Sequence, residues 1–361
     1  MLQMLVMSYF KILVTGGAGF VGSHLALALK EKFSSSKVIA LDNLKRRGSE
    51  LNLSRLSQGG VEFLHGDVRN PGDLGFMELD WIIECSAEPS ALAGRFGDTD
   101  YLVHTNLLGT YHSLELARRC KAGIIFLSSS RVYPIAPIRQ FPFVELQTRF
   151  VLEKNFSVAG ASVSGITEEF PLDGARTLYG TTKLASELLV QEYAETFSIK
   201  MVINRCGVLT GPWQMGKIDQ GVVALWMARH FLGGKLSYIG YGGSGKQVRD
   251  LLHVDDLAEL VVLQMQDIEK HRGQTYNVGG GIENSISLVE LTKICQELTG
   301  NEITMEVDPV DHPGDVPWFV TDSSKVREAT GWNPQHSLKM TLKEILDWLE
   351  EHQHQLRAIL S

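Results

Sequence analysis

The chain has 361 residues, and 34 lysine and arginine residues against 42 aspartate and glutamate residues give a formal net charge of −8. No broad basic surface is available to neutralise phosphates, so we expect neither nucleic-acid binding nor binding to an anionic membrane surface. Hydrophobic residues make up 44% and charged residues 21%, which excludes a disordered chain and fits one large domain or two modest ones.

The sequence shows little that would direct the chain to a membrane or out of the cell. Met1–Ser8 is apolar but lacks the basic residues and cleavage site of a signal peptide, and we expect an upstream start codon or a frayed tail there. No apolar run reaches the ~20 residues of a membrane helix. The cysteines form no CxxC pair, which argues against a disulfide framework or a metal site and favours a reducing, cytoplasmic location. They are Cys85, Cys120, Cys206 and Cys295.

Short apolar runs alternate with helix-length amphipathic stretches through the first two thirds of the chain. Helical patterns such as 21–33 and 106–120 lie between strands that are nearly continuous in apolar character, as is typical of parallel strands with helices on both faces. This alternation predicts right-handed βαβ units in a Rossmann-type, doubly wound parallel sheet of the α/β class. The predicted strands are 11–15, 37–42, 61–67, 81–86, 124–129 and 201–205.

The pattern changes beyond Gly211, where glycine and proline become more frequent. Helices are predicted there at 255–267, 288–299 and 338–352. We therefore expect a dinucleotide-binding domain at 1–210 and a smaller mixed α/β lobe for the substrate at 211–361, with the chain crossing back between the two.

A glycine-rich loop follows the first predicted strand directly and opens a helix. Its three regularly spaced glycines fit a GxxGxxG phosphate loop: one permits the tight turn, one lets backbone N–H groups approach a pyrophosphate, and one lets helix and strand pack closely. The N-terminus of the helix adds partial positive charge. The predicted dinucleotide site contains Gly16, Gly19, Phe20, Val21 and Gly22.

Asp42 ends the second predicted strand, 20 residues beyond Gly22. A carboxylate there accepts hydrogen bonds from a ribose diol and repels a 2′-phosphate, which favours NAD over NADP as the cofactor. The alternative is that Lys45, Arg46 and Arg47 hold a 2′-phosphate.

Residues after the second and third strands complete the predicted cofactor site. Asn43 follows Asp42, and Asp67 and Val68 lie at the end of the third predicted strand, where they could reach the adenine edge. A plain turn at Gly66-Asp67 is the alternative interpretation.

A tyrosine and a lysine four residues apart form the predicted catalytic pair. Tyr179 and Lys183 share one face of a predicted helix, where the ammonium group is expected to lower the tyrosine pKa and to hold the nicotinamide ribose. A phenolate can then take a proton from a sugar hydroxyl while hydride leaves the carbon. Ser129, at the end of a predicted strand, can orient that proton.

In this order the motifs resemble the extended short-chain dehydrogenase/reductase family, which contains the sugar-nucleotide epimerases and dehydratases. The resemblance runs from about residue 11 to about residue 334 and implies bound NAD, a nucleotide-sugar substrate and a homodimer formed through helices 106–120 and 179–197. The dehydratases carry Asp-Glu where this chain has Ser130 and Arg131, which argues against a 4,6-dehydratase. Besides the glycine loop, the matching motifs are 128–133, YxxxK at 179–183, 249–250, 253–256 and 276–280.

Within this family, the stretches 204–221 and 243–250 resemble the CDP-tyvelose (CDP-paratose) 2-epimerases more than the 4-epimerases. The resemblance implies transient oxidation of carbon 2 of a CDP-(deoxy)hexose, with hydride returned to the other face. It implies that Arg249 grips the diphosphate, with a salt bridge to Asp250 or Asp255 as the alternative. The implied substrate-binding residues are Ser130, Arg131, Cys206, Gln214, Asp219, Gln220 and Arg249.

The chain departs from the family in two places. Tyr133-Pro134 replaces Tyr-Gly, and the 46 residues from Tyr133 to Tyr179 include an insertion at about 141–170 that could be a lid, an interface element or a surface excursion. Three rival functions remain: an NAD(P)H-dependent keto-sugar reductase, a 4-epimerase, and a catalytically silent dinucleotide-sensing protein.

Overall fold

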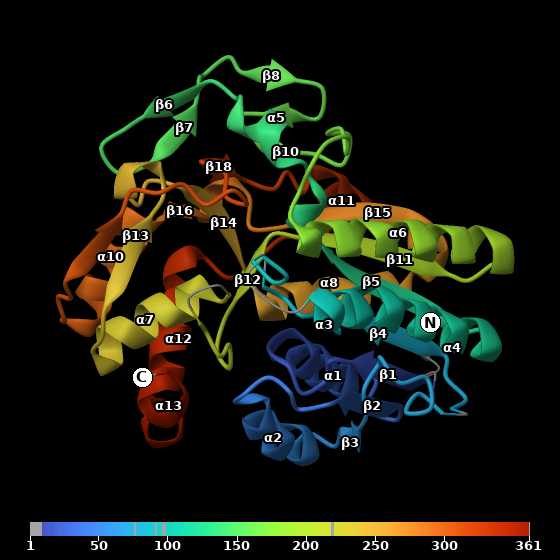
Figure 1. The fold of residues 1–361 in the computed structure, drawn as a ribbon. Coiled ribbons are helices and arrows are strands. Elements are labelled where there is room, and N and C mark those ends of the chain that lie inside the picture. Colours follow the sequence, from blue (N-terminus) through green and yellow to red (C-terminus); the bar gives the residue numbers. More distant parts are fainter. Residues whose placement is uncertain (1–8, 76, 91, 96–98, 218–219, 361) are drawn as a thin grey trace, which may run out of the picture.

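The computed structural model describes residues 9–75, 77–90, 92–95, 99–217 and 220–360 (Figure 1). The apolar segment Met1–Ser8 and the predicted substrate residue Asp219 lie outside the described residues. None of the helices in the described part of the chain combines the length and the apolar character that a membrane crossing requires.

A seven-stranded parallel sheet forms the centre of the larger lobe, in the order β15-β11-β5-β4-β1-β2-β3. The strand order reverses between β1 and β4, and open α/β sheets bind ligands at the carboxyl ends of the strands beside such a switch point. The predicted Rossmann-type, doubly wound sheet is confirmed. The strands are β1 (Lys11–Thr15), β2 (Lys37–Asp42), β3 (Glu62–His65), β4 (Trp81–Glu84), β5 (Gly123–Ser129), β11 (Met201–Cys206) and β15 (Gln274–Val278).

Two of these strands are shorter than predicted. β3 ends before Gly66 because the backbone N–H of Asp67 turns away from the sheet and donates to the Asp73 carboxylate at 2.9 Å. β4 ends at Glu84, two residues earlier than predicted.

Helices cover both faces of the sheet (Figure 1). One layer buries Leu25, Leu56 and Leu257 from α1, α2 and α8, and the other buries Leu114 and Val190 from α4 and α6. The predicted helix 106–120 starts as a π-helical turn, η2, before α4 continues it. The helical elements of this lobe are α1 (Phe20–Lys32), η1 (Ser49–Leu51), α2 (Asn52–Gln58), α3 (Thr99–Val103), η2 (His104–Leu108), α4 (Gly109–Cys120), η3 (Ser130–Val132), α6 (Leu178–Phe197), α8 (Val254–Gln266), α9 (Ile268–His271) and α11 (Ser324–Thr330).

The smaller lobe combines short strands and helices around its own apolar core. Trp226, Leu291 and Leu346, from three different helices, are buried together there. β15 and α8 come from beyond residue 211 but belong to the larger lobe, so the chain crosses back between the lobes. The elements are β12 (Val208–Thr210), α7 (Val222–Leu232), β13 (Leu236–Ile239), η4 (Tyr241–Gly243), β14 (Val248–His253), η5 (Ile282–Asn284), β16 (Ser285–Ser287), α10 (Leu288–Thr299), β17 (Met305–Asp308), β18 (Trp318–Phe319), α12 (Leu338–Glu351) and α13 (Gln353–Leu360).

The insertion at about 141–170 folds into two small antiparallel sheets, β6-β7 and β8-β9-β10. Its Phe141 and Phe170 pack with Tyr133 and Phe319 in a separate apolar cluster. The Arg149 guanidinium also binds the Glu290 carboxylate of α10, so the insertion contacts the smaller lobe. Its elements, with the preceding helix, are α5 (Ile135–Arg139), β6 (Phe143–Glu145), β7 (Phe150–Leu152), β8 (Ser157–Val158), β9 (Ala161–Ser162) and β10 (Gly165–Ile166).

Candidate active site

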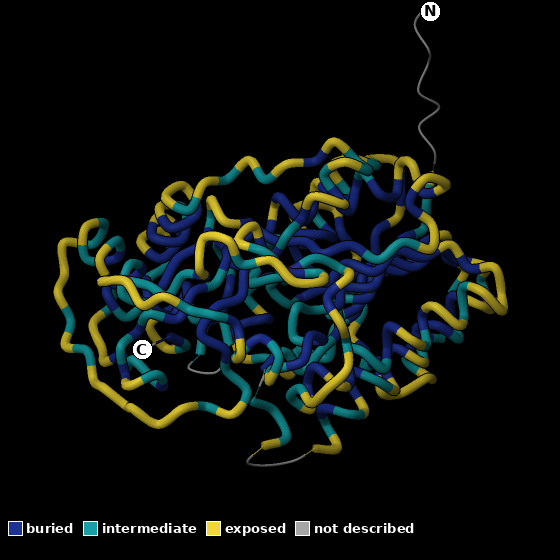
Figure 2. The backbone as a smooth tube through the Cα atoms, turned by 90° about the horizontal axis from the view of Figure 1, so that it is seen from above, coloured by how far each residue is buried: buried dark blue, intermediate teal, exposed yellow. Residues whose placement is uncertain are grey.

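Two connected cavities lie along the carboxyl ends of the strands. The first, of about 470 Å³, is lined by the glycine loop and the end of β2. The second, of about 500 Å³, is lined by the ends of β5 and α6 and by residues of the smaller lobe. Phe20, Val21, Gln214 and Gln220 line both cavities, which therefore form one cleft between the lobes. Figure 2 shows the buried segments gathered in the interior of the molecule and the exposed segments mainly along its periphery.

The glycine loop makes a cradle that only glycine permits. Gly16 has a φ of +61°, and a Cβ on Gly22 would lie 2.1 Å from the Gly16 oxygen. α1 begins at Phe20, and its N-cap residue Gly19 has no side chain to occupy the helix N-terminus. The loop thus leaves backbone N–H groups open to a pyrophosphate, and the residues present fit a dinucleotide.

Asp42 fits the ribose end of such a cofactor. Its carboxylate accepts hydrogen bonds from the backbone N–H groups of Ala18, at 3.1 Å, and Leu44, at 2.8 Å. Burial raises the pKa of Asp42, and these bonds oppose the rise. The same carboxylate lines the first cavity, where it would meet a ribose diol.

The basic residues after Asp42 also line the first cavity, but two of them bind backbone oxygens. The Arg46 guanidinium donates to the Met215 carbonyl, and the Arg47 guanidinium donates to the Ala358 carbonyl. These bonds tie the loop after β2 to the smaller lobe and give both side chains a structural role.

The turn after β3 holds its predicted cofactor residue Asp67 by internal hydrogen bonds. Hydrogen bonds from Arg69, followed by one from Asn43 at 2.9 Å, lower the pKa of Asp67 to about 2, so its carboxylate is engaged within the turn. Asn43 and Val68 line the first cavity.

The predicted catalytic residues come together in the second cavity. The Thr177 hydroxyl caps α6 by accepting the Gly180 N–H at 3.2 Å, which places Tyr179 in the first turn and Lys183 one turn further. Ser129 reaches the same cavity from the end of β5. Local capping and the parallel sheet therefore bring the three side chains to one point.

Burial dominates the electrostatics of the catalytic pair. Tyr179 is 9% exposed and Lys183 2% exposed, and burial raises the pKa of Tyr179 and lowers that of Lys183. A hydrogen bond with Ser129 and the positive charge of Arg131 oppose the rise at Tyr179. The prediction that Lys183 lowers the pKa of Tyr179 below its ordinary value is therefore wrong for this chain.

The sequence analysis missed Glu84, a fully buried carboxylate at the end of β4. It accepts hydrogen bonds from the hydroxyls of Thr15, at 2.8 Å, and Ser113, at 2.6 Å. Its charge raises the pKa of Lys183 against the effect of burial, so it supports the ammonium form. A glutamate that ends the apolar run Trp81–Ile83 was the signal in the sequence.

A second missed residue is Asn106, in the π-helical turn. Its amide donates to the Thr182 hydroxyl at 3.2 Å and accepts the Glu88 N–H at 2.8 Å. Asn106 thus joins α6 to the loop after β4 that lines both cavities.

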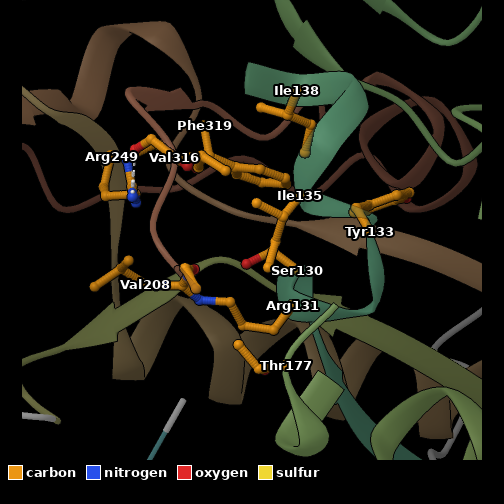
Figure 3. Close-up of a pocket in the computed structure, with 12 residues that line it drawn as sticks. Ser130, Arg131, Tyr133, Ile135, Ile138, Thr177, Val208, Arg249, Val316 and Phe319 are labelled. Carbon is orange, nitrogen blue, oxygen red and sulfur yellow. Dashed lines mark hydrogen bonds between the residues drawn. The ribbon is translucent and has the colours of Figure 1, made fainter. Parts of the chain in front are cut away.

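The substrate-binding candidates within the described residues all line the second cavity. One of them, Arg249, has a different ion-pair partner from the predicted alternative. Arg249 pairs with Asp315, so the alternative bridge to Asp250 or Asp255 is wrong. Arg249 also donates to the Val316 carbonyl at 2.8 Å (Figure 3). These lining residues are Ser130, Arg131, Cys206, Gln214, Gln220 and Arg249.

The Cys206 thiol is not activated as a nucleophile, and the Gln214 amide is hydrogen-bonded within the protein. Burial raises the pKa of Cys206 to about 12, which keeps it a thiol and excludes a nucleophilic role. The Gln214 amide donates to the Leu209 carbonyl at 3.0 Å and accepts from the Thr210 hydroxyl at 3.1 Å.

A dinucleotide cleft that opens onto a serine, a tyrosine and a lysine is the arrangement of a nicotinamide-dependent enzyme that oxidises or reduces a hydroxyl-bearing carbon. The chain belongs to the NAD dependent epimerase/dehydratase family, whose model matches residues 12–279. It is therefore an enzyme of the NAD-dependent sugar-nucleotide epimerases and dehydratases, and NAD is its cofactor.

Individual relatives in this family act at different carbons. A CDP-paratose 2-epimerase of Salmonella typhi is 32% identical, over 94% of this chain and 98% of its own. UDP-glucuronic acid decarboxylase 6 of Arabidopsis thaliana is 30% identical, over 95% and 89%. The solved structure of UDP-glucuronic acid 4-epimerase from Bacillus cereus, with UDP-glucuronic acid and NAD, has a TM-score of 0.77 at 25% identity, over 94% and 99%.

Proposed function

We propose that the protein is an NAD-dependent epimerase that inverts carbon 2 of a CDP-activated (deoxy)hexose. The observation that carries the proposal is that Ser129, Tyr179 and Lys183 line one cavity. Ser130 and Arg131, which follow Ser129 in the sequence and line the same cavity, carry no carboxylate. An elimination of water needs an acid and a base there, whereas an epimerisation does not. The similarity to a 2-epimerase over nearly the whole chain supports the choice of carbon.

Each catalytic side chain has one task in this reaction. NAD, held by the glycine loop and Asp42, would supply hydride chemistry, with the hydride removed from one face of the sugar carbon and returned to the other. Tyr179 takes the hydroxyl proton and gives it back to the keto oxygen. Ser129 holds the phenol oxygen in place through their hydrogen bond. The charge of Glu84 supports the ammonium form of Lys183, which would bind the nicotinamide ribose.

The test is to incubate the purified enzyme with CDP-, UDP- and GDP-hexoses in deuterated water and to analyse the products by NMR. We expect the carbon-2 epimer without solvent deuterium and without net consumption of cofactor. Solvent deuterium beside a carbonyl would contradict the hydride mechanism, and stoichiometric loss of NADH would indicate a keto-sugar reductase. Inversion at carbon 4 would indicate a 4-epimerase, as in the Bacillus cereus relative.

Tyr179→Phe tests the role of the phenol. Loss of a general acid–base should lower kcat by about 10²- to 10⁴-fold. NAD should still be released from the denatured variant, as shown by mass spectrometry. Tyr193→Phe is the matched control, because Tyr193 lies on the same helix and bonds Glu115 at 2.7 Å away from the cleft. Unchanged turnover by Tyr179→Phe would remove Tyr179 from the mechanism.

We infer that the protein is a homodimer that pairs α4 and α6 with their copies. Leu108, Tyr111 and Leu188 are 38%, 40% and 61% exposed and line a shallow apolar groove over these adjacent helices. Leu188→Asp should shift the molar mass in light scattering from a dimer to a monomer, whereas Val310→Asp, on a distant exposed side chain, should not. A monomeric parent protein would contradict the proposal.

We also propose a cytoplasmic location. The four cysteines are free in the structure, as a reducing compartment requires. Recovery of the protein in the cytoplasmic fraction of the cells would agree, and recovery in another compartment would contradict the proposal.

A further inference from the structure

Arg131 lines the same cavity as the catalytic tyrosine. Arg131 follows β5 in η3, and its backbone N–H donates to the Ser129 Oγ at 3.1 Å. Its carbonyl packs on the first turn of α6, where a Cβ on Gly180 would lie 2.1 Å from the Arg131 oxygen. Arg131 is therefore anchored in the same small group of residues that holds Tyr179, and its charge acts on the phenol.

The Arg131 guanidinium is incompletely neutralised. It donates to the Gly314 carbonyl at 3.0 Å, but a neutral carbonyl does not cancel its charge. The Asp315 carboxylate is paired with Arg249. Burial and the nearby Arg249 both lower the pKa of Arg131, yet an arginine stays protonated in proteins. The two guanidinium groups thus carry one more positive charge than Asp315 removes, which favours an anionic ligand.

The surroundings strengthen such an ion pair. Arg131 and Arg249 line the substrate cavity and also a smaller adjoining cavity of about 40 Å³ (Figure 3). Ile135, Ile138 and Phe319 give the smaller cavity apolar walls. Because these walls exclude water, an anion bound by a guanidinium there is held more tightly than at an open surface.

We propose that Arg131 binds the phosphoryl group attached to carbon 1 of the sugar and thereby presents carbon 2, rather than carbon 4, to Tyr179. This inference rests on the proposed function. Carbon 2 is bonded to carbon 1, whereas carbon 4 lies across the sugar ring. A phosphoryl group fixed beside the phenol therefore brings the neighbouring carbon to it, and orientation of this kind decides which bond reacts.

A binding cycle tests the phosphoryl contact without requiring turnover. The affinities of the NAD-loaded parent enzyme for CDP and CMP, and for UDP and UMP, are measured by calorimetry and compared with those of Arg131→Met. The parent should bind the diphosphate of the preferred base more tightly than the monophosphate, and Arg131→Met should reduce this preference by about 10- to 100-fold. Arg131→Lys should retain part of it.

Arg139→Met is the matched control. Arg139 donates to the carbonyls of His312, at 2.6 Å, and Asp315, at 2.8 Å, and so binds the same loop as Arg131 from outside the cavities. Its loss should leave the diphosphate preference unchanged. An equal loss in both variants would assign the effect to the loop and would overturn the proposal.

The second readout is the carbon that is oxidised. Sugars deuterated at carbon 2 or at carbon 4 report the reacting carbon, and Arg131→Met should lose selectivity for carbon 2 while its KM rises. Retained selectivity, KM and diphosphate preference would overturn the role of Arg131 and leave the proposed function standing. A lost diphosphate preference in a chain whose parent turns over no nucleotide sugar would support the phosphoryl contact and refute the proposed function.

A sugar carboxylate is the other source of an anion beside Arg131. The same comparison with UDP-glucose and UDP-glucuronate separates the two sources. If the parent binds the uronate more tightly and Arg131→Met removes only that difference, the guanidinium recognises a carboxylate and the proposal is overturned.

Discussion

A buried ion pair joins α6 to the sheet beneath the catalytic serine, and removing one partner should destabilise the protein more than removing both. The Glu187 carboxylate is 1% exposed and the Arg205 side chain 6%. Two Arg205 nitrogens bind the carboxylate at 2.7–3.1 Å, and the Ser128 hydroxyl also donates to it. Glu187→Ala therefore leaves a buried guanidinium and a buried hydroxyl without their acceptor.

The size of the effect follows from this geometry. An uncompensated buried charge costs about 3–5 kcal/mol, so we expect Glu187→Ala to lower the free energy of unfolding by that amount. Glu187→Leu combined with Arg205→Met removes both charges and fills the space with apolar groups, which is often neutral or stabilising. The double variant also loses the bond from Arg205 to the Tyr133 hydroxyl, at 3.2 Å, worth about 1 kcal/mol.

Chemical unfolding of the parent protein and its variants at one fixed NAD concentration measures these differences, since bound cofactor itself stabilises the folded state. We expect the double variant to unfold within about 1–2 kcal/mol of the parent protein. Glu187→Gln keeps the shape of the side chain and removes its charge. Its free energy of unfolding should lie between those of Glu187→Ala and the double variant. A double variant as unstable as Glu187→Ala would refute the reasoning, because the loss would then come from packing rather than from an unpaired charge.

Two further predictions concern the cofactor and the pH dependence of stability. Asp42→Asn removes the charge that repels a 2′-phosphate beside Lys45, and the NADP to NAD affinity ratio should rise by about tenfold or more; an unchanged ratio would contradict the role of Asp42. Burial lowers the pKa of His253 from 6.5 to about 4. The unfolded chain therefore binds a proton between these values that the folded chain excludes, and the unfolding free energy should fall as the pH decreases from 6.5 to 4. His253→Asn keeps an N-cap side chain and should flatten this slope; an equal slope in both proteins would exclude His253 as the cause.

Local sequence patterns predicted the strands, helices and glycine loop that surround the site, because these elements depend on interactions between residues close in the sequence. The strands Lys11–Thr15 and Lys37–Asp42 and the helix Leu288–Thr299 have the predicted bounds. Apolar continuity marks a parallel strand, and a strand followed by a glycine loop marks a phosphate cradle. The carboxyl ends of parallel strands share one edge, and Ser129 lines the same cavity as Tyr179.

The electrostatic partners could not be predicted in the same way. Asp315 lies 66 residues from Arg249, in the irregular segment between β17 and β18, so no local pattern indicates that the two residues pair. Burial is likewise a property of the whole fold. Burial raises the pKa of Tyr179. The sequence-based prediction considered only the helical spacing between Tyr179 and Lys183 and so could not include this effect.

The small strands of the insertion show a further limit. β8, β9 and β10 have two residues each, too few for an alternating pattern to be recognised. They are held instead by distant contacts, such as the Tyr133 hydroxyl on the Thr167 carbonyl at 3.1 Å. The sequence of this enzyme therefore predicts which residues gather at the strand ends, because that prediction needs only the side-chain types and the positions of the strands. The interactions among the charges of Arg131, Arg249 and Asp315 arise only once the folded chain brings these residues together at the cleft.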